Sequence, residues 1–189
     1  MFINHSPVMA EVTIKDKKFV PFLSAEEIQV RVQSLAAKIN QDYAGKKPLM
    51  IVVLNGAFIF AADLIRHLDI QPEVQFIRIS TYGDAMSSSE TAQLMLGLEV
   101  DVEGREVILV EDIIESGFTA AYFIDHVLDQ EPDSIKIATL LYKSSLFKGK
   151  YVPDYIGFDI PEAFVIGYGL DYAQRGRELP GIYQLAPGT

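Results

Sequence analysis

Three acidic residues interrupt one short apolar stretch of the chain, VILVEDIIESGFTAA at residues 107–121. A charged group in an apolar run is costly unless partners or a ligand compensate for its lost hydration. One acid at a strand end is usually a solvated cap, but this stretch holds Glu111, Asp112 and, at the following turn, Glu115. Neighbouring strand residues point to opposite faces, so the two adjacent acids have different tasks. The pattern predicts that these carboxylates belong to a functional site.

The residues that follow this strand predict a binding site for one phosphate group. Glu115, Ser116, Gly117, Phe118 and Thr119 form a turn that opens a predicted helix. Successive backbone N–H groups at a helix N-terminus, together with the two hydroxyls, are suited to cradle a phosphate. The turn has neither the Gly-Lys-Ser/Thr of a Walker A loop nor the G-x-G-x-x-G of a dinucleotide fold. Carboxylates beside such a phosphate suit ribose hydroxyls or a hydrated Mg²⁺.

Strands and helices alternate along the chain, which predicts an α/β fold with a mostly parallel central sheet flanked by helices. Ser24 and Glu27 form an S-x-x-E capping box at the start of the first helix. The run LMIVVL at 49–54 is continuously apolar and β-branched, as in a strand buried on both faces. Further strands are expected at 74–79, 107–110, 136–142, 155–158 and 164–168, and further helices at about 57–68 and 119–129.

Several polar residues fall at the carboxyl ends of these predicted strands, where parallel sheets bind their ligands. They are Asn55-Gly56, Thr81-Tyr82, the turn at 111–119 and Lys143. The stretch GDAMSSSETAQLMLG at 83–97 begins with small polar residues, which is typical either of a surface loop or of a lid. A long insertion in a compact domain is often functional, so we expect a mobile lid.

Composition limits the class of protein. The 189 residues favour one compact domain, and a net charge of −10 argues against a nucleic acid partner. The absence of cysteine excludes thiol chemistry, and the three histidines have no metal-ligand spacing. No apolar run has the roughly 20 residues of a membrane span, and the N-terminus does not resemble a signal peptide. We therefore expect a cytoplasmic enzyme that has no contact with membranes.

Taken together, the motifs resemble the type I phosphoribosyltransferases, in the purine-salvage form of the hypoxanthine-guanine phosphoribosyltransferases. The opening stretch is similar to the family's phosphoribosyl-pyrophosphate signature. VVLNGAFIFAADLIRHL is similar to its pyrophosphate-loop strand and helix, FIRISTYGD to the start of its mobile loop, and LLYKSS to its purine-contacting lysine strand. PDYIGFDIPEAFVIGYGLDYAQRGREL is similar to its C-terminal purine hood. The resemblance covers roughly residues 20–185, with the motifs in the expected order.

The resemblance implies a fold and a reaction. The fold is a core at about 45–150 with a small hood from about 1–23 and 151–189. The reaction is Mg²⁺-dependent transfer of the phosphoribosyl group from phosphoribosyl pyrophosphate to a 6-oxopurine, which gives the nucleoside 5′-monophosphate and pyrophosphate. The family also implies a homodimer or homotetramer.

Roles for individual residues follow from the resemblance. Glu111 and Asp112 match the acids that face the ribose diol, and with Asp171 they are the expected metal-associated carboxylates. Residues 115–119 match the 5′-phosphate cradle. The remaining matches are Asn55, Gly56 and Arg177 for pyrophosphate, Thr81 and Tyr82 for the lid, and Lys143, Phe164, Val165 and Asp171 for the purine. Within this set Lys143 donates to the purine 6-oxo group, Phe164 stacks on the base and Val165 offers it backbone bonds.

Two positions depart from the family pattern. The family usually has aspartate where this chain has Glu115, at the position that handles the purine N7 proton. The additional methylene adds about 1.5 Å of reach. Asn55 replaces the pyrophosphate-loop lysine of the human-type enzymes, which often follows a non-proline cis bond. The sequence leaves open whether the 54–55 bond is cis and how the two changes affect the rate.

Three alternative functions remain open at this point. A regulator with the same fold, such as a pyrimidine-operon attenuation protein, would bind RNA, but the acidic net charge opposes this. An enzyme of the same class could prefer xanthine or adenine. Lys143 favours a 6-oxo substrate because an ammonium donates and cannot accept from a 6-amino group. A nucleotide-binding module could also have lost turnover through the changes at Glu115 and Asn55.

Overall fold

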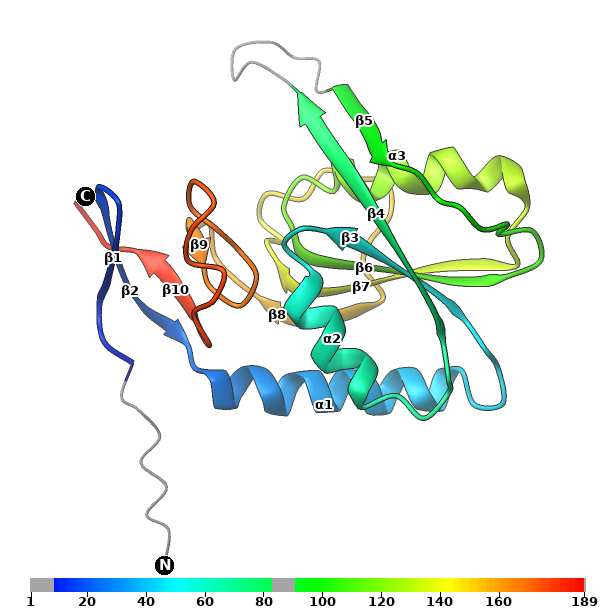
Figure 1. Ribbon diagram of the computed structural model, residues 1–189, viewed down its shortest axis with the longest axis horizontal. Helices are drawn as coiled ribbons and strands as arrows, with labels where there is room; N and C mark the ends of the chain where they lie inside the picture. The colour runs from blue at the N-terminus through cyan, green and yellow to red at the C-terminus, as the bar shows by residue number, and fades with distance from the viewer. Residues whose placement is uncertain (1–8, 83–90, 189) are drawn as a thin grey trace, which may run out of the picture.

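A computed structural model describes residues 9–82 and 91–188, and its central feature is a six-stranded sheet (Figure 1). The strand order is β5-β4-β3-β6-β7-β8. Every neighbouring pair is parallel except β4 with β5. The strands are β3 (Leu49–Leu54), β4 (Glu73–Tyr82), β5 (Thr91–Leu96), β6 (Glu106–Ile114), β7 (Ser134–Tyr142) and β8 (Tyr155–Asp159). The expected mostly parallel α/β sheet is confirmed.

Helices cover both faces of this sheet. Helices α1 (Ala25–Asp42) and α2 (Phe58–Arg66) lie on one face and α3 (Phe118–Val127) lies on the other, followed by the short 3₁₀ helix η1 (Leu128–Gln130) (Figure 1). The expected capping box is present, because the Ser24 hydroxyl accepts from Glu27 N at 3.2 Å and Ser24 N donates to the Glu27 carboxylate at 2.8 Å. Strands β3 and β6 carry buried side chains on both faces, as their continuous apolar sequences predicted.

A second, smaller sheet combines the two ends of the chain. It has the order β1-β2-β10-β9, with β1 (Val12–Ile14), β2 (Lys17–Leu23), β9 (Val165–Ile166) and β10 (Ile182–Leu185). All its pairs are antiparallel. The strand expected at 164–168 is therefore only two residues long and belongs to this sheet. We call this small sheet and the turns between β9 and β10 the hood; it lies beside the carboxyl ends of the core strands (Figure 1).

The predicted lid segment at 83–97 differs in part from the expectation. Residues 91–96 are not a loop, because they form β5 and pair with the end of β4. Residues 83–90 lie outside the described residues. Thr81 pairs with Ala92, and Tyr82 pairs with Thr91. The two residues that were predicted to belong to the lid, Thr81 and Tyr82, therefore lie in an antiparallel two-stranded arm at the edge of the sheet. Whether this arm acts as a lid stays a prediction.

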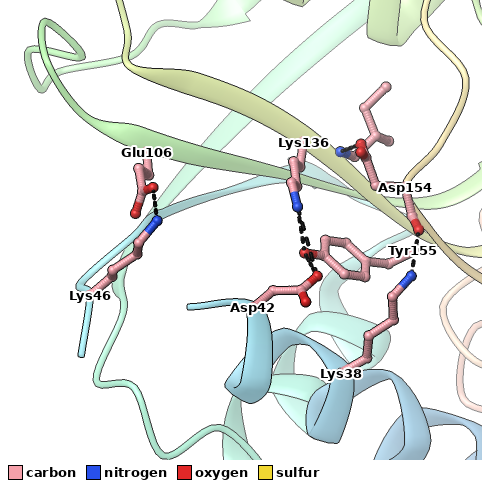
Figure 2. A network of polar contacts seen from close by, with 8 residues as sticks. Lys38, Asp42, Lys46, Glu106, Lys136, Asp154 and Tyr155 are labelled. Atoms are coloured by element: carbon pink, nitrogen blue, oxygen red, sulfur yellow. Dashed lines mark hydrogen bonds and ion pairs between the residues drawn. The ribbon is translucent and has the colours of Figure 1, made fainter. Parts of the chain in front are cut away.

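A polar cluster fixes the C-terminal end of α1 to the amino ends of the core strands (Figure 2). The hydroxyl of Tyr155 donates to Asp42 at 2.8 Å, and Lys136 lies 3.7 Å from the same carboxylate. Nearby, Lys46 pairs with Glu106 at 2.5 Å. These contacts lie at the end of the sheet opposite to the predicted ligand edge. Among the described residues no helix is long and apolar enough to cross a membrane.

Candidate active site

One cavity of about 500 Å³ lies at the carboxyl ends of the core strands, between the sheet and the hood. Predicted residues that line it are Asn55, Gly56, Glu111, Asp112, Glu115, Thr119, Lys143, Phe164, Val165, Asp171 and Arg177. These residues come from six separate segments of the chain. Ser116, Gly117 and Phe118 are not part of its lining, and the side chains of Thr81 and Tyr82 lie outside the described part of the structure. The structure thus brings together most of the site that the sequence predicted.

Glu111 is a buried carboxyl group inside a strand. The sequence suggested that Glu111 and Asp112 lie at the end of a strand. Strand β6 instead continues to Ile114, so both acids lie within it. The side chain of Glu111 is buried, and its Oε1 has no hydrogen-bond partner among the described residues. Burial, and next the neighbouring Asp112 charge, raises the pKa of Glu111 to about 8. An unpartnered buried oxygen beside a cavity is a candidate for contact with a ligand.

Asp112 faces the cavity and packs against the loop after β3. Burial raises its pKa to about 6, although its own backbone N–H, that of Ile113 and the charge of Arg177 favour the ionised form. A Cβ atom on Gly56 would lie 1.6 Å from Asp112 Oδ2, so only glycine lets the carboxylate approach the loop. The Leu54–Asn55 peptide bond just before this glycine is cis. The question that the sequence left open is thereby answered.

The turn at 115–119, which the sequence predicts to hold a phosphate, leads into the N-terminus of α3. Gly117 caps α3 in the left-handed conformation, with φ +81°. The Ser116 hydroxyl accepts from Phe118 N at 3.3 Å. Phe118 N is thereby engaged, so the N–H groups of Thr119 and Ala120, which have no acceptor within the helix, are the ones that remain for a ligand. A Cβ on Gly117 would lie 2.4 Å from the Phe147 ring, which closes the turn from behind.

Glu115 and Lys143 form an ion pair across the ends of β6 and β7. The Lys143 side chain is 6% exposed, whereas that of Glu115 is 51% exposed and lines the cavity. A buried ammonium requires a compensating carboxylate, and Glu115 provides it. The sequence suggested both residues separately, but nothing in their spacing indicated that they meet.

The hood supplies an arginine that is held in place by its own turn. Arg177 pairs with Asp171 at 2.6 Å and donates to Gly169 O at 2.7 Å. The second oxygen of Asp171 accepts from Gln174 N at 2.7 Å. Gly169 has φ +103°, and a Cβ there would lie 2.1 Å from Gly56 O. The hood turn therefore packs directly on the loop that carries Asn55 and Gly56.

Phe164 and Val165 form the hood wall of the cavity. Phe164 is 46% exposed, which is unusual for a phenylalanine, whereas Val165 is buried in β9. Five apolar lining residues were missed by sequence reasoning: Val53, Leu54, Ile79, Ile113 and Leu170. Apolar residues in strands and turns look the same whether they face a core or a ligand, so no signal in the sequence distinguishes them.

The carboxylates do not form a complete metal site from protein atoms alone. No group of three or more His, Asp or Glu side chains that could hold a metal occurs in the part of the chain that the structure describes. Mg²⁺ in phosphate sites is usually held by one or two carboxylates together with waters and substrate phosphates. The unpartnered oxygen of Glu111 and the cavity-facing Asp112 fit this arrangement. Asp171 is already engaged by Arg177.

Comparison with known proteins gives a consistent result. The family model described as "Phosphoribosyl transferase domain" matches residues 22–173. The chain is 45% identical over 167 residues to a hypoxanthine-guanine phosphoribosyltransferase of Bacillus subtilis (strain 168), with 88% of this chain and 93% of the relative covered. It is 39% identical to one of Aquifex aeolicus (strain VF5), with 91% and 97% covered.

Solved structures agree with these relatives. A crystal structure of a hypoxanthine-guanine phosphoribosyltransferase from Bacillus anthracis str. 'Ames Ancestor', with HEPES in its active site, matches with a TM-score of 0.84 and 38% identity. That match covers 88% of this chain and 98% of the other.

Proposed function

Because this chain belongs to the hypoxanthine-guanine phosphoribosyltransferase family, we propose that it transfers the phosphoribosyl group of phosphoribosyl pyrophosphate to hypoxanthine or guanine. The products are the nucleoside 5′-monophosphate and pyrophosphate. The chain then serves purine salvage.

The contact between Glu115 and Lys143 carries the proposal. It brings a proton acceptor and an ammonium donor together in the cavity that the exposed ring of Phe164 also lines. In a 6-oxopurine the N7 proton and the 6-oxo oxygen are neighbours on one edge of the ring. A base stacked on Phe164 can offer this edge to both side chains, with Val165 giving backbone bonds.

The acids and the cradle suit the sugar half of the reaction. Departure of pyrophosphate leaves positive charge on the ribose, as in glycoside chemistry. Glu111 and Asp112 contact the ribose hydroxyls and in their ionised forms stabilise that charge, and residues 115–119 hold the 5′-phosphate. Bound Mg²⁺ would supply charge neutralisation at the diphosphate, with Glu111 and Asp112 near it and Asp171 in support. Arg177, Asn55 and Gly56 hold the leaving anion.

Turnover of hypoxanthine, guanine, xanthine and adenine with phosphoribosyl pyrophosphate and Mg²⁺ tests the activity. We expect rates with hypoxanthine and guanine and none with adenine. Fastest turnover of xanthine would reassign the base preference, and no turnover of any base would indicate a nucleotide-binding protein. Sedimentation analysis of the same sample tests the proposed homodimer or homotetramer.

The Lys143→Ala variant tests the role of the buried ammonium. Loss of a charged donor to the 6-oxo group should cost roughly 2–4 kcal/mol in kcat/KM. Lys150→Ala is a suitable control, because Lys150 pairs with Asp125 at 3.2 Å on the surface, outside the cavity. Unchanged discrimination between hypoxanthine and adenine in Lys143→Ala would refute the assignment.

A further inference from the structure

Tyr172, in the hood, joins the N-terminal hairpin to the wall of the cavity. Its hydroxyl donates to Asp16 Oδ1 at 2.9 Å, in the turn between β1 and β2. Lys17 Nζ from the same hairpin lies 5.8 Å from the centroid of the Tyr172 ring. The tyrosine is therefore held at its hydroxyl and at its ring by a segment about 150 residues away in the chain.

The ring of Tyr172 in turn supports Phe164. The two rings meet edge to face, with centroids 5.9 Å apart and planes at 85°. Phe19 is fully buried in β2, and the centroid of its ring lies 6.1 Å from the centroid of each of the two rings. Phe164 thus has two aromatic neighbours on the hood side, while nearly half of its surface remains exposed. This arrangement fixes the plane of the exposed ring.

Neither Tyr172 nor Asp16 lines the cavity, so neither touches a ligand there. Phe164 is the cavity-lining residue that the Tyr172 ring contacts, so a change of that ring reaches a ligand through Phe164. A stacking surface that is already ordered saves the conformational entropy that a free ring would lose on binding. The geometry of an aromatic pair also depends on ring orientation, so a displaced ring stacks less well.

We propose that Tyr172, held by Asp16, is a positioning residue that sets the affinity for the purine base by fixing the ring of Phe164. The inference rests on the proposed function, in which the base stacks on that ring. It assigns a role in base recognition to the β1–β2 hairpin, which lies outside the core of the fold.

Three variants separate the parts of this contact. Tyr172→Leu removes the ring, Tyr172→Phe removes only the hydroxyl, and Asp16→Ala removes the acceptor. The chain also offers a matched control, because Tyr151 donates to Asp125 at 2.7 Å with Lys150 Nζ 4.7 Å from its ring centroid. This pair has the same chemistry but lies outside the cavity, so Tyr151→Phe reports the cost of losing such a bond elsewhere.

The measurement is the KM for hypoxanthine against the KM for phosphoribosyl pyrophosphate, with thermal unfolding of every variant. In Tyr172→Leu the hypoxanthine KM should rise by about 3- to 10-fold, the effect of one aromatic pair, while the phosphoribosyl pyrophosphate KM stays within about 2-fold. Tyr172→Phe and Asp16→Ala should raise the hypoxanthine KM by about 2-fold, and Tyr151→Phe should leave both constants unchanged.

The two proposals fail in different ways. A parent enzyme that turns over no base refutes the proposed function, and the inference with it. An active parent with an unchanged hypoxanthine KM in Tyr172→Leu, or with both KM values raised by the same factor, overturns the inference alone. If Tyr172→Leu does not fold, the decision rests on Tyr172→Phe and Asp16→Ala, and unchanged hypoxanthine KM values in both overturn the inference.

Discussion

Glu115 connects the wall of the cavity to a buried lysine. Its carboxylate extends across the strand ends to the buried ammonium of Lys143, and it is half exposed to the cavity. The side chain compensates a buried charge, and we propose that it also accepts the purine N7 proton. The first task needs an oxygen that accepts from the Lys143 ammonium, whereas the second needs a group that can gain a proton.

Glu115→Gln separates these tasks. The amide keeps the size of the side chain and can still bond to Lys143, but it cannot take the proton. Because a general base contributes typically 10²–10⁴-fold, kcat should fall by about that factor while the affinity for phosphoribosyl pyrophosphate changes little. Glu115→Asp restores the family's usual residue and should keep most of the activity. Parent rates in both variants would show that Glu115 is no base.

Glu111 makes the stability of the ligand-free protein depend on pH. Its pKa is about 8 when folded, against a usual value of 4.5. Between these two values the folded state binds more protons than the unfolded state, so this group makes the free energy of unfolding fall as the pH rises. Glu111→Gln cannot ionise and should remove this dependence.

Urea unfolding of the parent and of Glu111→Gln at pH 4 and pH 8 measures the effect. We expect similar stabilities at pH 4, below the usual pKa of 4.5, and a variant that is more stable by about 1–3 kcal/mol at pH 8, the usual cost of an unsatisfied buried group. The difference between the two proteins cancels the contributions of other titrating groups, apart from that of the adjacent Asp112. A parent that is the more stable of the two at pH 8 would mean that Glu111 is ionised without cost.

At the scale of elements, the site depends on close packing of the hood turn on the loop after β3. Gly169→Ala would place a Cβ atom 2.1 Å from Gly56 O, so the hood must move away from the core. A displacement of about 1 Å in a catalytic arrangement can cost on the order of 100-fold in rate. We therefore expect kcat/KM to fall by about 10- to 100-fold.

Gly45→Ala is the matched control for this change. Both glycines have positive φ, +103° and +77°, so both substitutions strain the backbone, but a Cβ at Gly45 meets no atom within 4 Å. Its kcat/KM should stay near that of the parent while its melting temperature falls. If both variants lose activity equally, backbone strain and not the contact with Gly56 O is responsible.

The elements with regular patterns could be predicted from the sequence. The capping box at Ser24 and the apolar run of β3 gave correct elements, because local chemistry determines them. The hood strands β1, β2 and β10 were not predicted, since they are short and are defined by pairing between the two ends of the chain. Strand β5 was missed for a similar reason, because its pairing with β4 determines it.

The site was predictable to the extent that it repeats strand-end chemistry. The acids of β6, Lys143 at the end of β7 and the turn at 115–119 could be recognised, because each has a distinctive residue type at a strand end. The contacts between these residues could not be predicted, since the ion pair of Glu115 with Lys143 depends on how neighbouring strands align. The contact of Tyr172 with Phe164 could not be predicted either, because it depends on how the hood packs.

At the scale of the molecule, the two ends of the central sheet use polar residues differently. At the carboxyl end, Glu111 has an oxygen without a partner in the described part of the chain, and this residue lines the cavity. At the amino end, Asp42, Lys136 and Tyr155 contact one another and fix α1 to the sheet (Figure 2). Stability and activity should therefore respond separately to changes at the two ends.

Tyr155→Phe tests this separation at the amino end. Tyr155 is 1% exposed, and its hydroxyl donates to Asp42 at 2.8 Å. Lys136 Nζ donates to the Tyr155 hydroxyl oxygen at 3.3 Å. Removing a buried hydroxyl between two charged groups should lower the free energy of unfolding by about 1–2 kcal/mol. Tyr151→Phe, which loses a more exposed bond to Asp125, should lower the free energy of unfolding less.

Both variants should keep the KM values of the parent, because neither residue lines the cavity. A Tyr155→Phe enzyme with normal stability but altered KM values would mean that the amino end of the sheet acts on the site, and that the two ends are coupled through the core strands.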